Sequence, residues 1–222
     1  MWIIAAHGYG SDGRSMASFA KMYYAMGFSI LLPDARGHGK SGGDYRGMGW
    51  DDRIDYLHWI KKINKEHNSP EIALFGVSMG ASTVMMTEGE DMPSNVKAVI
   101  EDCGYASIKE ELTYVLKSTF KLPSFPIINF ASTVTHIRAG YSLISDGSCV
   151  EAVAKSDTPT LFIHGDADKF VPLSQMKELC TAANCEKEKL IVHGAGHGQS
   201  ASVDREGYCK KVQIFLSKYM GG

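Results

Sequence analysis

Short apolar runs alternate with longer amphipathic runs along most of this chain, and that alternation constrains the fold more than any other feature of the sequence. It is typical of strands joined by crossover helices, which form a mostly parallel sheet. The short runs are rich in Ile, Leu, Val and Phe, as in strands that are covered on both faces. We predict strands at 2–6, 29–33, 71–77, 96–101, 160–164 and 189–193, giving a sheet of about six strands flanked by helices.

The amphipathic runs between these strands predict the helices. In 15–26, Met16, Phe19 and Tyr23 share one stripe, and Gly27 follows where such helices commonly stop. In 50–67, apolar positions alternate with charged ones at helical spacing, so one face packs and the other is solvated. The predicted helices are 15–26, 50–67, 79–88, 173–182 and 203–219.

Length and charge limit the class of protein. A chain of 222 residues is long enough for one domain with a sizeable core, so we predict a single domain over 1–222. The formal net charge of -2 gives no reason to expect nucleic acid as a partner, because phosphate binding depends on clustered Lys and Arg. No apolar run has the length that spans a bilayer, so we expect no membrane-spanning segment in this chain.

The start of the chain bears on location. No signal peptide precedes the fold, which by itself says little about location. Our expectation is a cytoplasmic location. Because the first predicted strand begins at residue 2 with no polar leader, we also expect more chain upstream, either further strands or a targeting or anchor segment.

The five cysteines are scattered without CxxC spacing, which indicates neither a zinc site nor a dense disulfide framework. Cys180 and Cys185 could close a short loop in an oxidising compartment, but we expect two unlinked thiols.

The segment 105–157 interrupts the alternation, since it places roughly fifty residues where one crossover helix would suffice. We interpret it as a helical cap inserted at the end of a parallel strand, over the crevice where ligands bind. Its apolar side chains suggest an acyl or aryl substrate, although they could equally form the cap's own core. They are Phe120, Leu122, Phe125, Ile127, Ile128, Phe130 and Tyr141.

The motif with the most chemical content is GVSMG at 76–80, between an apolar strand and a helix. A serine on such a sharp turn stands above the end of the sheet, and the flanking glycines relieve the crowding of the strained backbone. The pattern alone is weak, because a Gly-rich turn can match it by chance. Its position between a strand and a helix favours Ser78 as a nucleophile.

A serine hydroxyl needs a base within hydrogen-bonding reach and a third group that fixes the tautomer of the base. When the serine lies on such a turn between a strand and a helix of a parallel sheet, the order along the chain is nucleophile, acid, histidine. Each of the three follows the carboxyl end of a strand. Asp168 and His197 follow the last two predicted strands, so we predict that they complete a triad with Ser78. Asp166 and Asp102 are alternative acids, and His193 is the alternative base.

The oxyanion of a tetrahedral intermediate requires preorganised N–H donors. We predict that one is the amide of Met79, directly after the nucleophile, and that the other is the amide of Tyr9 in HGYG after the first strand. HGYG taken alone could also be an ordinary glycine turn.

These segments together resemble the α/β-hydrolase superfamily over nearly the whole chain, since HGYG, DARGHGKSGG, GVSMG, HGDADKFVP and GAGHG stand in the order of that family. The stretches GMGW, EDCGY and IRAGYS are similar to those of bacterial esterase-like hydrolases related to serine peptidases of the prolyl-oligopeptidase group. The resemblance implies Ser78, Asp168 and His197 as the triad, with Tyr9 and Met79 at the oxyanion hole.

The chain departs from its relatives at one edge of the sheet. Such proteins usually have two further strands ahead of the one that leads into HGYG, and both are absent here. The strand around Leu31 then becomes a sheet edge, and we predict that it either pairs with a second copy as a homodimer or is covered by a rearranged segment.

The leading functional hypothesis is a serine esterase that cleaves small-molecule carboxylic esters through an acyl-enzyme. The same groups would serve amide, peptide or thioester hydrolysis, and a catalytically silent binding protein of the same fold is the alternative from another class. We expect no cofactor and no metal site, because the mechanism requires neither. The run GHGKSGG lacks the full spacing of a phosphate-binding loop.

Overall fold

Residues 1–221 are described by a computed structural model, in which six parallel strands form one sheet in the order β2-β1-β3-β4-β5-β6. The predicted α/β-hydrolase architecture is confirmed. The strands are β1 (Trp2–Ala6), β2 (Ser29–Leu31), β3 (Ile72–Val77), β4 (Val96–Asp102), β5 (Thr160–Gly165) and β6 (Lys187–Val192). β2 ends two residues before its predicted end at Pro33, which has no N–H to continue a ladder.

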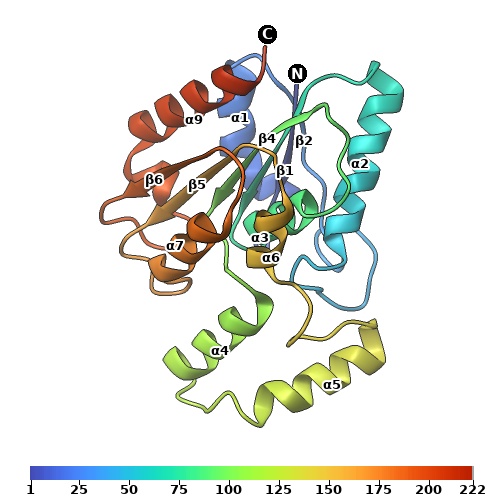
Figure 1. Cartoon of the computed structure of the whole chain (residues 1–222), viewed down its shortest axis with the longest axis vertical. Coiled ribbons are helices and arrows are strands. Elements are labelled where there is room, and N and C mark those ends of the chain that lie inside the picture. The colour runs from blue at the N-terminus through green and yellow to red at the C-terminus, as the bar shows by residue number, and fades with distance from the viewer. Residues whose placement is uncertain (222) are drawn as a thin grey trace.

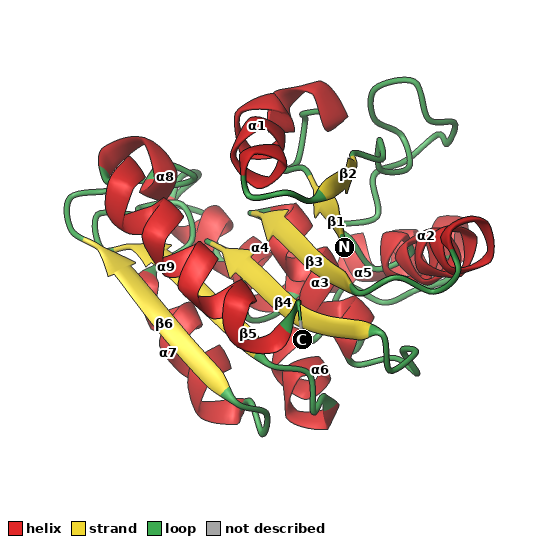
Figure 2. Ribbon diagram, turned by 90° about the horizontal axis from the view of Figure 1, so that it is seen from above, coloured by secondary structure: helices red, strands yellow, loops and turns green. Residues whose placement is uncertain are grey.

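Helices cover both faces of the sheet, as Figure 2 shows. Side chains alternate along each strand, so Ile3 and Ala5 pack toward α1 and α9, whereas Ile4 and Ala6 pack toward α2 and α3. One layer holds α1 (Ala17–Ala25) and α9 (Arg205–Tyr219), and the other holds α2 (Asp52–His67), α3 (Met79–Glu88), α6 (Cys149–Lys155) and α7 (Leu173–Ala182). The core is thus two apolar layers separated by the sheet.

Two predicted helices are each divided in the structure. The first begins as a 3-10 turn, η1 (Gly13–Met16), because the Asp12 side chain accepts a hydrogen bond from the Ser15 amide and caps that turn. The last is split into α8 (Ser200–Val203) and α9, since Asp204 leaves the helical conformation and accepts a bond from the Gly207 amide. At both places the side chain of an aspartate caps the turn that follows it, so the helix is not continuous where the sequence pattern alone predicts that it is.

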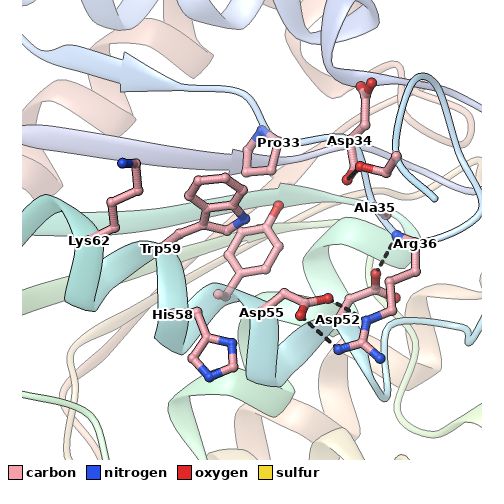
Figure 3. Close-up of a pocket in the computed structure, with 11 residues that line it drawn as sticks. Pro33, Asp34, Ala35, Arg36, Asp52, Asp55, His58, Trp59 and Lys62 are labelled. Atoms are coloured by element: carbon pink, nitrogen blue, oxygen red, sulfur yellow. Dashed lines mark hydrogen bonds and ion pairs between the residues drawn. The ribbon is translucent and has the colours of Figure 1, made fainter. Parts of the chain in front are cut away.

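Strand β2 is the sheet edge and pairs with β1 alone among the described residues. The loop that follows it is held against α2, because the Arg36 amide donates to Asp52 and the Arg36 guanidinium makes two bonds to the Asp55 carboxylate (Figure 3). A hollow of about 270 Å³ lies between this loop and α2. Pairing of the edge with a second copy stays a prediction.

The predicted cap segment, residues 105–157, leaves the sheet after β4 and returns at α6. We call this segment the excursion. It contains α4 (Ile108–Ser118) and α5 (Ile127–Ala139), which lie together at the lower end of the molecule in Figure 1, away from the sheet. A single antiparallel bridge between Ser107 and Ser148 closes the base of this excursion. Those two serines also cap α4 and α6 through their side chains, so the excursion begins and ends at fixed points.

No helix within residues 1–221 combines the length and apolar character that crossing a membrane would require. All five cysteines, Cys180 and Cys185 among them, are free thiols in the structure.

Candidate active site

Ser78 lies on a strained turn between β3 and α3. Its φ of 57° is in the left-handed region, where a side chain costs about 1–3 kcal/mol. A Cβ at Gly76 would overlap the backbone of Gly80, and a Cβ at Gly80 would overlap the carbonyl of Ala6 in β1. The two flanking glycines therefore let the turn pack closely while the serine hydroxyl stands at the carboxyl end of the sheet.

The structure brings Ser78, His197 and Asp168 into one hydrogen-bonded row. His197 Nε2 lies 2.7 Å from Ser78 Oγ, and His197 Nδ1 lies 2.7 Å from Asp168 Oδ2. The loop after β5 supplies the aspartate and the loop after β6 supplies the histidine, so three chain segments meet at one edge of the sheet. The centroid of the Phe170 ring lies 5.0 Å from that of the His197 ring, so the two rings are in contact.

Asp168 is prepared to act as a charged acceptor. Its side chain is fully buried, and its Oδ1 accepts bonds from the amides of Phe170 and Val171 at 2.8 and 3.0 Å. Burial opposes ionisation, but the bonds from His197 and from these two amides together lower the pKa of the carboxyl below its usual value. Asp168 is thus an anion whose two oxygens are both held in place.

The side chains of the alternative residues have other partners, although the Asp102 backbone carbonyl accepts a bond from the Ser78 amide at 2.9 Å. Asp166 and His193 bond to each other at 2.7 Å in an exposed pair, apart from Ser78. Asp102 accepts a bond from Ser200 Oγ at 3.1 Å, and burial raises its pKa to about 7. In the present arrangement Asp168, and neither alternative, is the carboxylate bonded to His197.

The turn that carries Tyr9 is fixed by two histidines. His7 Nε2 accepts a bond from the Ala35 amide at 2.9 Å, and His38 Nε2 accepts one from the Gly10 amide at 3.2 Å. HGYG is therefore tied to the loop after β2. Among the residues described, neither the Tyr9 amide nor the Met79 amide donates to another protein group, so both N–H groups are available to a ligand.

A cavity of about 340 Å³ opens beside Ser78 between the sheet and the excursion, within the size range of small-molecule sites. It is lined by Tyr9, Arg46, Met48, Ser78, Met79, Tyr105, Glu111, Leu112, Val115, Thr135, Tyr141, Leu143 and Phe170. Of the seven apolar cap residues singled out from the sequence, Tyr141 alone lines this cavity. Four others, Phe120, Leu122, Phe125 and Phe130, are exposed.

Glu111 is a cavity residue that the sequence did not reveal. Its Oε2 accepts a bond from Gln175 Nε2 at 3.2 Å, whereas its Oε1 is buried without a partner in the described chain. Burial raises the pKa of this carboxyl to about 7. In the sequence, Glu111 is merely an acidic residue in the first turn of a helix, which is common on exposed surfaces.

Cys103, Asp168 and His197 form a group whose ligand atoms all lie within 4.8 Å of one another. These residue types could hold a metal ion in principle. Burial raises the pKa of the Cys103 thiol well above its usual value, which disfavours the thiolate that metal binding needs. Asp168 and His197 already satisfy each other, so the geometry fits the hydrogen-bonded row better than a metal centre.

Comparison with known proteins agrees with the fold. The family model for serine aminopeptidase, S33, matches residues 1–130, more than half of the chain. The Bacillus subtilis protein YqkD is 29% identical over 215 residues, covering 96% of this chain and 70% of its own length. Among solved structures, the Pyrococcus furiosus esterase Pf2001 superposes with a TM-score of 0.80 at 22% identity, covering 99% of this chain and 83% of that one. A monoacylglycerol lipase from Paleococcus ferrophilus gives 0.69 at 20% identity, covering 98% and 94%.

Fold and neighbours define an α/β-hydrolase. The chain belongs to the serine aminopeptidase S33 family, and it is a hydrolase.

Proposed function

We propose that this protein is a serine esterase with Ser78 as nucleophile, His197 as general base and acid, and Asp168 as the group that orients the histidine. The observation that carries the proposal is the row of two 2.7 Å hydrogen bonds from Ser78 through His197 to Asp168. Such a row supplies what a weak hydroxyl nucleophile lacks, namely a base in contact with it and a fixed tautomer of that base.

The reaction proceeds in two halves. Ser78 Oγ attacks the ester carbonyl as its proton passes to His197 Nε2, and the amides of Tyr9 and Met79 donate to the resulting oxyanion. The intermediate collapses when the alcohol leaves with the proton from His197, which yields an acyl-serine. Water, deprotonated by His197, then attacks that carbonyl, and the acid leaves as Ser78 recovers its proton. The excursion over 105–157 acts as the cap that encloses the acyl or aryl group.

Amide hydrolysis is a second candidate, favoured by the carboxyl of Glu111 in the cavity and by the description of the family. A carboxylate beside the nucleophile would bind a cationic amine of the substrate. Because burial raises the pKa of Glu111 to about 7, this attraction would be incomplete at neutral pH. The apolar lining from Leu112, Val115 and Leu143 fits a neutral acyl group better.

Two substrate series separate the candidates. The protein and its Ser78→Ala variant are assayed on p-nitrophenyl esters of graded chain length and on aminoacyl p-nitroanilides. We expect ester hydrolysis that depends on chain length and is lost in Ser78→Ala. Faster turnover of the anilides, reduced by Glu111→Gln, would favour the aminopeptidase instead. Equal rates from the protein and Ser78→Ala would remove Ser78 from the mechanism.

A further inference from the structure

The outer side of the α4–α5 excursion gathers exposed apolar side chains. We define the outer cap face as Phe120, Leu122, Phe125, Phe130, Val134 and Ile137. Within residues 1–221 thirteen large apolar residues are exposed, and these six all fall within 120–137. Large exposed apolar surfaces on monomeric proteins commonly mark a site of interaction with a partner, and here six such side chains fall within 18 residues of the chain.

Helix α5 carries an apolar stripe on the side opposite the one that faces the protein. Ile128 is buried and Thr135 lines the Ser78 cavity, so one side faces the protein. Phe130, Val134 and Ile137 follow the spacing i, i+4, i+7 and are 71%, 55% and 77% exposed. A helix that only covers a core turns its apolar stripe toward that core, so an exposed apolar stripe requires another explanation.

The charged side chains in the part of the sequence that carries this face are all positive. Between residues 112 and 145 the sequence contains no Asp or Glu, although the whole chain carries a net charge of -2. Lys117, Lys121 and Arg138 are exposed there, and none of the three forms an ion pair with a carboxylate in the described structure. A partner for this surface would thus be apolar and negatively charged.

We propose that the outer cap face docks on a lipid bilayer that contains anionic headgroups. Its apolar side chains would enter the boundary between headgroups and acyl chains, while Lys117, Lys121 and Arg138 would meet lipid phosphates. A second copy of this chain fits less well. Two-fold pairing through the same face would bring both copies of these three cations into one interface, with no carboxylate from 112–145 to pair them.

Docking in this way also indicates a class of substrate. This second inference rests on the proposed function. The same two helices contribute Leu112, Val115 and Thr135 to the cavity beside Ser78. A bilayer on their outer side would bring that cavity close to the lipid surface. The substrate class is then an ester that partitions into the bilayer rather than one dissolved in water.

The test measures binding without catalysis. Flotation of the Ser78→Ala protein is compared on vesicles of phosphatidylcholine alone and of phosphatidylcholine with phosphatidylglycerol. One variant combines Phe130→Ser, Val134→Ser and Ile137→Ser, and a second combines Lys117→Gln, Lys121→Gln and Arg138→Gln. The matched control, Tyr24→Ser with Ile214→Ser, removes exposed apolar side chains from the body of the protein.

We expect anionic lipid to strengthen vesicle binding by roughly fivefold for each contributing cation. The charge variant should lose that gain, the apolar variant should bind at least about tenfold more weakly to both vesicles, and the control should match the parent.

If the triple apolar variant fails to fold, Ile137→Ser alone should still weaken binding. Absence of binding, or equal loss in the control, would overturn the proposal. So would a dimer that the apolar variant abolishes without any change on vesicles. Because the assay needs no turnover, its result is independent of whether the protein is an esterase.

Discussion

Replacing Asp168 with Asn removes one charge from the row while it keeps the shape of the side chain, so it isolates what the carboxylate does. In the native site, one oxygen accepts from His197 and the other accepts from the amides of Phe170 and Val171. An asparagine has one oxygen and one NH2 group, so it cannot serve both sides. If its oxygen still accepts from the two amides, its NH2 group donates to His197 Nδ1. The imidazole proton is then on Nε2, which can no longer accept the proton of Ser78.

The size of the loss follows from the second orientation. If the oxygen turns to His197 and restores the reactive tautomer, the NH2 confronts two backbone donors and both of their bonds are lost. Each buried backbone N–H that loses its acceptor costs about 1–3 kcal/mol, so the reactive orientation lies roughly 2–6 kcal/mol higher. At about 1.36 kcal/mol per factor of ten, kcat falls from roughly thirtyfold to roughly 10⁴-fold. Loss of the negative charge beside the imidazolium moves the result toward the upper end of that range.

The assay is steady-state hydrolysis of a p-nitrophenyl ester, with Asp166→Asn as the matched control. Asp166 is two residues away and also bonds a histidine, His193, but that pair is exposed and apart from Ser78. We expect Asp166→Asn to retain activity within about twofold, since a surface pair contributes little. A loss below about tenfold in Asp168→Asn, or equal losses in the two variants, would refute this reasoning.

Two other substitutions test the surroundings of the row. His7→Ala leaves the Ala35 amide without its acceptor and loosens the HGYG turn. On the same ester, we expect kcat to fall about ten- to a hundredfold with KM little changed. An unchanged kcat would mean that the turn holds its shape without His7. Glu88 is buried, and its burial raises the pKa to about 8 in the folded protein from an ordinary value near 4.5. The folded state therefore binds more protons than the unfolded state between these values, and the free energy of unfolding falls as pH rises through this window. Glu88→Gln should flatten that fall by about 3–4 kcal/mol between pH 5 and pH 8 in urea unfolding, at about 1.36 kcal/mol per pH unit. Part of the slope persists because the pKa values of Asp102 and Glu111 are also raised. A slope identical to that of the parent would contradict this reasoning.

The sheet and the position of Ser78 were predictable because local rules decide them. Strands buried on both faces must be apolar along their whole length, and the tight turn at Ser78 admits no side chain at Gly76 or Gly80. Chain order then limited the acid and the base to a few loops. The choice between Asp166 and Asp168 depended on which carboxylate the folded loop buries, which is a tertiary property.

The cap was less predictable for a physical reason. Apolar content alone cannot tell which side of α5 faces the protein, so Phe130 was considered both for substrate contact and for the core of the cap, whereas it is 71% exposed. Glu111 was missed because its burial depends on Gln175, which lies 64 positions further along the chain. The break at Asp204 arises from a side-chain cap that competes with helix continuation.

Covalent labelling tests the proposed nucleophile most directly. The protein is treated with a fluorophosphonate, and the modified residue is identified by mass spectrometry of peptides, with His197→Ala treated in parallel. We predict one adduct, on Ser78, with labelling strongly slowed in His197→Ala because its base is missing. An adduct on another residue, or ester hydrolysis that continues after Ser78 is fully blocked, would contradict the assignment of Ser78 as the nucleophile.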